Sequence, residues 1–312
     1  MNIIANLLLM GLSLLNSLFL SNQFIYQLQD KLSNQLLTYQ KPIAHENIGQ
    51  LKDYHYSPYP TNNNPNANFN FKAIAGLAYD LDSDVILAKK NENQRLPIAS
   101  LTKIVTSLVI LKEHKLDEIV TIPEGIKVGD DDQKLGIKPG QKFKLSELLR
   151  ASLIYSANDA ALALAIWDSG TVEKFATKMN SFAGSWGLNN SHFTNPAGFD
   201  DKDHYSTASD LVILVKILLN NKQLSGMVDT PQYTITSQEG KPYPIINTNR
   251  LLLSYNYIHG IKTGFTLAAG QSVIVLSKKN DRSIVTIILN SPDRFGETKQ
   301  LIDFTINNYT WK

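Results

Sequence analysis

The chain has 312 residues, which is enough for one large catalytic domain or two small ones. The formal net charge of +2 gives no indication of nucleic-acid binding, and a hydrophobic fraction of 43% is ordinary for a protein with a buried core. The sequence contains no cysteine, which excludes a disulfide framework, a thiol nucleophile and a cysteine-bound zinc ion.

The N-terminal segment is apolar: residues 1–29 carry no charged side chain, and Ile3–Leu20 consist mostly of Leu, Ile, Met and Phe. A helix of this length can cross a bilayer, at ~1.5 Å per residue over a core of ~30 Å. We therefore expect residues 1–22 to be a membrane anchor or a signal peptide, with a buried core helix as the third alternative. No basic residue precedes the run and no A-x-A-like site follows it, which favours the anchor. Both membrane interpretations place the rest of the chain outside the cytoplasmic membrane, in the periplasm or cell-wall space.

Residues 23–70 are expected to be a juxtamembrane segment followed by a linker. Apolar residues at helical spacing continue to Leu36, but residues 39–70 lack a hydrophobic period and contain four prolines and several asparagines. As a flexible coil, ~32 residues span roughly 30 Å, which suits a spacer between a membrane and a domain. The folded catalytic domain is expected at residues 71–312.

The predicted elements of the domain begin with a hairpin, whose strands are Ala73–Tyr79 and Val85–Lys89. Helices are predicted at Leu101–Lys112, 144–168, 171–186 and 207–220. Strands follow at Gly260–Thr266, Gln271–Lys278 and Ser283–Asn290, and a last helix at Arg294–Tyr309. Strands at both ends with helices between them predict one α+β domain, with an antiparallel sheet built from both chain ends and flanked by helices.

The first motif is Ser100-Leu101-Thr102-Lys103, the one S-x-x-K of the chain. A serine and a lysine three residues apart share one face of a helix. At a helix start, the serine also has free backbone N–H groups and the positive end of the helix dipole nearby. A serine nucleophile needs a base, and a lysine whose pKa is lowered by burial can be that base. The apolar neighbours of Lys103 favour burial over the simpler alternative, a capping serine beside a surface lysine.

The second motif is Ser156-Ala157-Asn158, expected where a helix meets a loop. The serine can relay a proton between a lysine and a leaving group, and the asparagine amide can bind a substrate carbonyl. S-x-N alone is a weak signal, because a helix cap has the same residues and a second copy occurs at Ser254-Tyr255-Asn256. That copy directly precedes the third motif, so we expect it in a loop rather than on an opposing wall.

The third motif is Lys262-Thr263-Gly264, on a predicted strand. Alternation along a strand places Lys262 and Gly264 on one face and Thr263 on the other. The glycine leaves room for a substrate backbone against the strand edge, the lysine supplies positive charge and the threonine supplies a hydroxyl donor. The simpler alternative is an edge strand with a blunting lysine.

The three motifs occur in the order that is the signature of penicillin-binding proteins and β-lactamases. From about residue 71 onward the chain resembles the D-alanyl-D-alanine carboxypeptidase family of low-molecular-weight penicillin-binding proteins, which implies a penicillin-binding/β-lactamase-like transpeptidase fold. The resemblance is carried by Pro97–Thr106 (PIASLTKIVT), Ser156–Ala160 (SANDA), Asn195–Phe199 (NPAGF), His204–Ala208 (HYSTA) and Gly260–Thr266 (GIKTGFT). The C-terminal β-domain and amphipathic anchor of many members find no counterpart in these residues.

The resemblance implies a serine-type carboxypeptidase that removes the terminal D-alanine from peptidoglycan stem pentapeptides through a Ser100 acyl-enzyme. Lys103 is then the general base. Ser156, helped by Lys262, passes a proton to the leaving D-alanine. β-Lactam antibiotics are the expected covalent inhibitors, and no metal or other cofactor is required.

The same resemblance implies how the substrate is held. Asn158 binds the substrate amide, and the backbone N–H groups of Ser100 and Phe265 form the oxyanion hole, in which one donor typically contributes ~3–4 kcal/mol. Thr263 and Gly264 complete the substrate-binding strand.

Arg294 is the candidate for recognising the free carboxylate of the substrate, because a guanidinium can grip a carboxylate with two parallel hydrogen bonds. Of the two arginines after the third motif, Arg282 begins a strand after a turn and is expected to face solvent. Arg294 opens the last helix, after a strand expected to pair beside residues 262–264. Its surroundings resemble the family stretch whose arginine meets the substrate carboxylate. The simpler alternative is a surface pair with Asp293 or Glu297.

Three other activities remain to be weighed. A class A β-lactamase has aspartate where this chain has Ala157, and its deacylating glutamate cannot be placed here. A D,D-endopeptidase that cuts cross-linked peptidoglycan uses the same three motifs. A catalytically silent penicillin-binding module would lack a catalytic group, whereas every expected group is present.

No metal site is expected from the sequence. The six histidines show no H-E-x-x-H spacing, and we interpret His204 as a structural or rim residue. We interpret the run Asp130-Asp131-Asp132 as a solvated loop.

Overall fold

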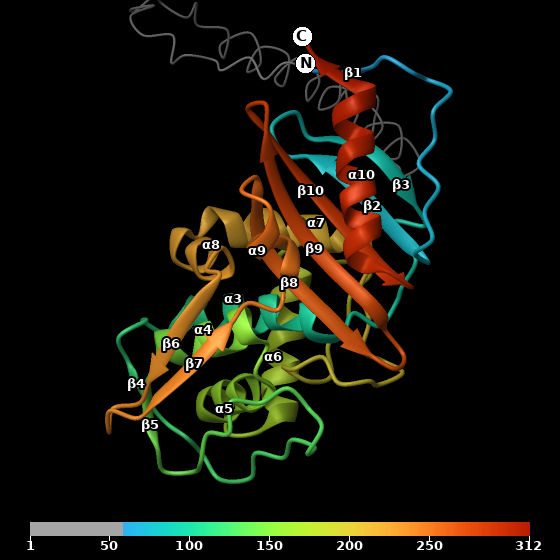
Figure 1. Ribbon diagram of the computed structural model, residues 1–312. Helices are drawn as coiled ribbons and strands as arrows, with labels where there is room; N and C mark the ends of the chain where they lie inside the picture. Colours follow the sequence, from blue (N-terminus) through green and yellow to red (C-terminus); the bar gives the residue numbers. More distant parts are fainter. Residues whose placement is uncertain (1–58) are drawn as a thin grey trace, which may run out of the picture. The chain divides into compact units, whose positions relative to one another are not determined.

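The computed structural model describes residues 59–312 (Figure 1). The anchor or signal peptide expected at 1–22 lies outside the described residues, as does most of the segment expected at 23–70. Within residues 59–312, no single helix has the length and hydropathy to cross a membrane, although the bent pair Ala208–Asn220 and Lys222–Val228 passes the same test when taken together.

A five-stranded antiparallel sheet runs through the domain in the strand order β3-β2-β10-β9-β8. Its strands are β2 (Ala75–Asp80), β3 (Val85–Lys90), β8 (Ile258–Thr266), β9 (Gly270–Lys279) and β10 (Arg282–Ser291). Figure 1 shows the strands from the two ends of the chain lying in one sheet. The predicted α+β class, the N-terminal hairpin and the three C-terminal strands are therefore confirmed.

Most helices pack on one face of this sheet through a continuous apolar core. They are η1 (Ala99–Thr102), α3 (Lys103–Glu113), α4 (Leu145–Arg150), η2 (Ala151–Tyr155), α5 (Asn158–Ser169), α6 (Val172–Ser185), α7 (Ala208–Asn220) and α8 (Lys222–Val228). The remaining helices are α9 (Arg250–Ser254) and α10 (Arg294–Asn308). Two further two-stranded antiparallel sheets pair β4 (Ile119–Thr121) with β5 (Lys142–Lys144) and β6 (Gln232–Thr236) with β7 (Pro242–Ile246).

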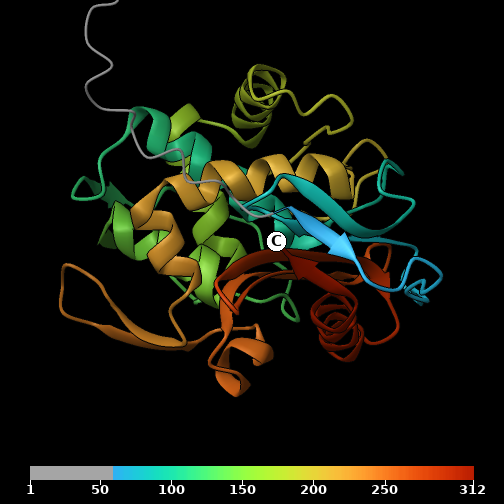
Figure 2. The ribbon, with the colours of Figure 1, turned by 90° about the horizontal axis from the view of Figure 1, so that it is seen from above.

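Alternate residues of the sheet pack into two separate cores. In β2, Leu77 belongs to the core under the helical layer and Ala78 to the core under α10. Ile274 and Val275 of β9 are divided in the same way. Successive side chains of a strand point to opposite faces, and Figure 2 shows α10 on one side of the sheet and α7 on the other. Because both faces are covered, these strands are continuous apolar runs in the sequence.

The predicted helix at 144–168 is wrong in one respect, because it is interrupted at Ser156. Residues 145–155 are helical through α4 and η2, and α5 begins at Asn158. Between them, Ser156 has φ 67° and ψ 28°, in the left-handed region that L-residues rarely adopt. The next turn is tied to a distant loop, since the Asn158 N–H donates to the carbonyl of Gln133 at 2.8 Å. No glycine or proline marks this break, so the local pattern gave no sign of it.

The first described residues pack onto the domain. Strand β1 (Pro60–Asn62) pairs antiparallel with β11 (Tyr309–Trp311), and the rings of Phe69 and Phe304 lie 5.7 Å apart. The linker composition gave no indication of this strand pair, which attaches residues 59–70 to the domain. The division at 1–22, 23–70 and 71–312 otherwise stays a prediction.

Candidate active site

A groove of about 630 Å³ lies between strand β8, the start of α3 and the helix break at Ser156. The predicted site residues that line it are Ser100, Ser156, Asn158, Thr263, Gly264, Phe265 and Arg294. Lys103 and Lys262 are buried beside it, with 0% and 1% of their surface exposed. The structure therefore brings all of the predicted site residues together, from four separate parts of the sequence.

Ser100 lies in the short turn η1, which leads directly into α3. The preceding residue, Ala99, has φ 48°, in the left-handed region. The hydroxyl of Thr102 donates to the carbonyl of Ala99 at 2.8 Å and holds this unusual turn. Because the turn precedes α3, Ser100 lies at the positive end of the helix dipole, as the sequence predicted.

The side-chain nitrogen of Lys103 has three partners, each at 2.7 Å: Ser100 Oγ, Asn158 Oδ1 and the carbonyl oxygen of Ala197. An amide oxygen and a carbonyl oxygen can only accept hydrogen bonds. A neutral amine has two N–H groups and one lone pair. If the two N–H groups serve Asn158 and Ala197, the lone pair faces the Ser100 hydroxyl. The geometry is therefore that of a base placed to take the serine proton.

The surroundings of Lys103 favour its neutral form. Burial lowers the pKa of Lys103 well below its ordinary value of 10.5, and the positive charge of Lys262 lowers it further. The carboxylates of Asp132 and Asp159 act in the opposite direction, but their effect is smaller than that of burial. A buried amine that is neutral near neutral pH can act as a general base.

Lys262 is a second buried amine, and a different set of neighbours determines its pKa. Burial, and then the charge of Arg294, lowers the pKa of Lys262 to about 7. Its nitrogen donates to the carbonyl of Thr263 at 3.2 Å. A pKa near 7 allows both charge states at neutral pH, so this lysine can deliver a proton. Within residues 59–312 the Ser156 hydroxyl has no hydrogen-bond partner, which leaves it available to a substrate in the groove.

Gly264 allows strand β8 to approach the nucleophile turn. A Cβ atom at this position would lie 2.8 Å from the carbonyl oxygen of Ile98 and 3.3 Å from the nitrogen of Ser100. From the sequence, this glycine is expected to leave room for the substrate backbone; in the structure it makes room for the turn that carries Ser100. On the other face, the hydroxyls of Thr263 and Thr248 lie 2.6 Å apart.

Arg294 reaches the groove from the start of α10. Its Nη1 donates to the carbonyl of Gly264 at 2.7 Å, and its buried Nε has no partner in the described chain. Neither Asp293 nor Glu297 pairs with it in this structure: Asp293 caps α10 through the Gly296 N–H, and Glu297 is bound elsewhere. The sequence analysis expected the strand before Arg294 to pair beside β8. That expectation is wrong, because β9 lies between β8 and β10.

The comparisons with known proteins identify the family of this chain. The family model described as D-alanyl-D-alanine carboxypeptidase matches residues 61–293, which include all three motifs. The chain belongs to this family. The family match ends one residue before Arg294, so the position of this arginine rests on the geometry of the groove.

Curated relatives in the family are similar over most of this chain. D-alanyl-D-alanine carboxypeptidase DacF of Bacillus subtilis is 30% identical over 247 residues, which are 76% of this chain and 63% of that protein. DacC of Escherichia coli is 32% identical over 249 residues, which are 74% of this chain and 60% of that protein. The chain thus spans 63% and 60% of the length of these two family members.

Solved structures show the same fold. The Streptomyces K15 DD-transpeptidase has a TM-score of 0.72 at 26% identity, covering 77% of this chain and 99% of that one. Penicillin-binding protein D2 of Listeria monocytogenes, solved in its ampicillin-bound form, has a TM-score of 0.67 at 27% identity, covering 77% and 100%. The penicillin-binding transpeptidase fold expected from the resemblance is therefore confirmed.

His204, in the HYSTA segment of this family member, supports the nucleophile turn. It is 2% exposed, and burial lowers its pKa from 6.5 to about 4, so the ring is neutral at pH 7. The Thr194 N–H donates to Nδ1, which leaves Nε2–H to donate to Thr102 Oγ1 at 2.7 Å. The Thr102 hydroxyl donates in turn to Ala99. His204 thus has a structural role: it begins a chain of hydrogen bonds that runs through Thr102 and ends at Ala99, beside Ser100.

Several groove residues were missed by the sequence analysis. Asp131 and Asp132 are exposed, as predicted, but both also line the groove. Thr248 also lines the groove, and Arg250 lines the neighbouring pocket together with Arg294. Both residues precede the third motif, whereas only arginines after that motif were considered as candidates. The S-x-N copy at 254–256 lies at the end of α9 and does not line the groove. Within residues 59–312 no cluster of His, Asp or Glu is arranged to hold a metal ion.

Proposed function

We propose that this chain is a serine-type D-alanyl-D-alanine carboxypeptidase that removes the terminal D-alanine from peptidoglycan stem pentapeptides. The observation that carries the proposal is the 2.7 Å contact between Lys103 Nζ and Ser100 Oγ, made by an amine whose pKa burial lowers well below its ordinary value. Membership of the family supports the reaction class. β-Lactam antibiotics would acylate the same serine.

In the acylation step, the Ser100 oxygen attacks the carbonyl carbon of the penultimate D-alanine while Lys103 takes the hydroxyl proton. The electron pair of the carbonyl moves onto its oxygen, and the backbone N–H groups of Ser100 and Phe265 would donate hydrogen bonds to that oxygen. One such donor typically stabilises the transition state by ~3–4 kcal/mol. Asn158 holds the substrate amide from the opposite wall.

In the next step, the amide C–N bond breaks and the leaving nitrogen needs a proton. Lys262, whose pKa is about 7, can supply it through the Ser156 hydroxyl, so that D-alanine leaves as an amine. Water then attacks the ester carbonyl, the Ser100 oxygen takes back a proton, and the shortened peptide leaves as a carboxylic acid.

The leaving-group end of the groove supports recognition of a free carboxylate. Arg294 and Thr263 line this end, and the Nε of Arg294 still has a hydrogen to donate. A charged hydrogen bond from a guanidinium to the α-carboxylate would distinguish the end of a chain from its middle.

A D,D-endopeptidase is the second candidate, because the groove continues beyond Arg294. A pocket of about 580 Å³ shares Thr248 and Arg294 with the groove and is also lined by Arg250, Leu253 and Phe295. A departing D-alanine does not need this space, whereas a second stem peptide would.

The location of the enzyme is also a proposal. The apolar run Ile3–Leu20, within an uncharged segment of residues 1–29, supports attachment to the outer face of the cytoplasmic membrane, through an anchor or by way of a signal peptide. Cell fractionation of the full chain and of a variant without residues 1–22 tests this. Wild-type protein in the membrane fraction supports an anchor, and a soluble, shortened extracytoplasmic protein supports a signal peptide.

The full chain tests the activity directly. We expect it to release D-alanine from a peptide ending in D-alanyl-D-alanine, and to be inactive on the same peptide ending in L-alanine. Preferential cleavage of cross-linked dimers over free pentapeptide would favour the endopeptidase. Wild-type turnover by Ser100→Ala would remove the proposed nucleophile.

A further inference from the structure

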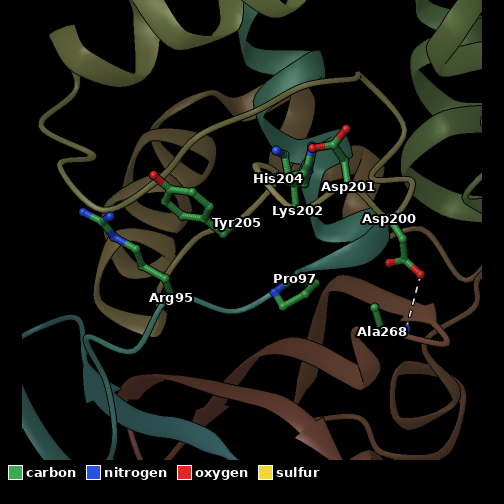
Figure 3. A pocket seen from close by; sticks show the side chains of 8 residues that line it. All are labelled: Arg95, Pro97, Asp200, Asp201, Lys202, His204, Tyr205 and Ala268. Carbon is green, nitrogen blue, oxygen red and sulfur yellow. Dashed lines mark hydrogen bonds between the residues drawn. The ribbon is translucent and has the colours of Figure 1, made fainter.

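A second cavity, of about 440 Å³, opens beside the other end of the groove (Figure 3). Asp200 lines both the groove and this cavity, so the two adjoin at that residue. Figure 3 shows Arg95 and Pro97 on the segment before the nucleophile, the loop 200–205 opposite them, and Ala268 from the turn after β8. We call this space the acyl-side cavity.

The position of the acyl-side cavity relates it to one part of a substrate. We take Thr263 and Arg294 as the leaving-group end, and Phe265 to Leu267, which follow Gly264 along the chain, also line the groove. The next residue, Ala268, is already in the cavity. If the terminal carboxylate lies at Arg294, the residues on the acyl side of the scissile bond extend along β8 toward this cavity. This step rests on the proposed function.

The cations of the acyl-side cavity lack charged partners. Arg95 is exposed, donates to the amide oxygen of Asn190 at 3.1 Å and lies over the ring of Tyr205 at 5.0 Å. Lys202 is exposed and makes no hydrogen bond or ion pair within the described residues. Neither cation meets a carboxylate in the described part of the chain, so both can donate to an incoming anion.

The carboxylates of the cavity are already engaged. Asp200 accepts from the Thr266 hydroxyl at 2.5 Å and from the Ala268 N–H at 3.2 Å, the second of which Figure 3 draws. Asp201 accepts from the Asp203 N–H at 2.8 Å. His204 turns its ring inward to Thr102, and its pKa of about 4 leaves it neutral. In the described residues, the charged donors of this cavity without an acceptor are therefore the Lys202 ammonium and the remaining N–H groups of Arg95, and the Tyr205 hydroxyl is a neutral one.

We propose that the acyl-side cavity binds a carboxylate on the acyl side of the scissile bond, through Arg95 and Lys202. The preferred substrates are then D-alanyl-D-alanine peptides with an upstream acidic group. Stem peptides can carry such a group on a γ-linked glutamyl residue or on a diaminopimelyl residue. Both sources offer the same ligand, a carboxylate that can accept hydrogen bonds from a guanidinium and an ammonium group.

The test compares matched peptides on the full chain. One pair has glutamate or its amide as the γ-linked residue, with lysine following it, and a second pair has diaminopimelate or lysine in that later position. In at least one pair, we expect kcat/KM to be about 5- to 20-fold higher for the peptide with the extra carboxylate. This is the gain in binding that one or two partly exposed charge contacts provide. The pair that shows the preference identifies the source of the carboxylate. Because exposed charges are screened, high salt should reduce the preference.

Substitutions at Arg95 and Lys202 test whether these two residues cause the preference for the acidic peptide. Lys202→Gln and Arg95→Gln should each reduce the acid-to-amide ratio by about 3- to 5-fold while the amide peptide is hydrolysed as before. Lys174→Gln removes an exposed lysine of α6 and is the matched control for net charge, so it should leave the ratio unchanged. Acylation by benzylpenicillin should stay unchanged in all three variants, because its acyl side chain carries no carboxylate.

Two results would contradict the inference while leaving the proposed function intact. Equal hydrolysis of acid and neutral peptides in both pairs would show that the cavity recognises no carboxylate. Equal losses on acid and amide peptides in Lys202→Gln would show that this lysine acts in some other way. If no peptide released D-alanine at all, the proposed function itself would fail, and the inference with it.

Discussion

The buried floor of the groove and the acyl-side cavity use the same kind of residue for opposite purposes. Lys103 and Lys262 have almost no exposed surface, and burial lowers the pKa of each. Lys202, at the rim of the acyl-side cavity, is exposed. A buried amine can lose its proton and take part in proton transfer, whereas an exposed ammonium group stays charged and can only attract. Position in the fold, rather than residue type, therefore decides what a lysine does here.

The two regions should also respond to change on different scales. Groups in the floor have fixed partners, so their removal alters the reaction itself. Charges at the rim are screened by water and salt, and their removal alters only how well a substrate is held. Each prediction below either breaks this contrast or makes it quantitative.

The largest effect is expected for Lys103→Ala. Loss of the base should slow acylation by penicillin about 10²- to 10⁴-fold, which a stopped-flow or gel assay with fluorescent penicillin can measure. Lys202→Ala is the matched exposed lysine and should change the rate less than about 3-fold. Near wild-type acylation in Lys103→Ala would mean that another group is the base.

The second effect concerns His204 and pH. Its pKa is 6.5 when free and about 4 in the fold, so only the unfolded chain takes up a proton between these values. The free energy of unfolding should therefore fall by about 3 kcal/mol as the pH drops from 6.5 to 4, with no contribution from this group above that window. Urea unfolding of wild type and His204→Gln at several pH values measures it. The variant should start less stable at pH 7 and lose less on acidification; parallel curves would contradict the prediction.

The third effect is at the leaving-group end. Arg294→Ala should lower kcat/KM for a D-alanyl-D-alanine peptide about 10- to 150-fold, the equivalent of a charged hydrogen bond of roughly 1.5–3 kcal/mol. The loss should appear mainly in KM and should exceed the loss in penicillin acylation. Arg250→Ala is the comparison, because Arg250 lines the neighbouring pocket and its charge also lowers the pKa of Arg294. An equal or larger loss in Arg250→Ala would move the carboxylate contact to that residue.

The smallest effect is far from both regions. A chain that begins at Asn68 lacks β1, so β11 loses its partner strand. We expect it to fold and to keep its activity, but to be about 1–2 kcal/mol less stable than a chain that begins at Ser57. Thermal or urea unfolding of the two chains measures the difference. An inactive or insoluble shorter chain would show that residues 57–67 are needed for the fold.

The sequence was sufficient for elements whose apolar pattern is strong. Strands β2, β9 and β10 and helices α6, α7 and α10 lie close to their predicted bounds. The sequence was insufficient where contacts with distant residues determine the backbone conformation or the strand pairing. The break at Ser156 contains no glycine or proline, and the pairing of β1 with β11 joins the two ends of the domain. Neither feature has a local signal in the sequence.

The candidate site was likewise predicted only in part from the sequence. Motif order was enough to name the residues, since spacing on a helix or strand predicts which side chains share a face. It did not reveal the contact of Lys103 with the Ala197 carbonyl, or the close packing of Gly264 on Ser100. Such contacts join segments far apart in the sequence, and they hold the Lys103 nitrogen 2.7 Å from the Ser100 hydroxyl.

The most direct test is to identify the residue to which penicillin binds covalently. The full chain is treated with benzylpenicillin, and its intact mass and peptide map are measured for wild type and Ser100→Ala. The account predicts one penicillin per chain, attached to the peptide that contains Ser100, and no adduct in a Ser100→Ala variant whose melting temperature is nearly unchanged. An adduct on another residue, or one that persists in a folded Ser100→Ala variant, would contradict it.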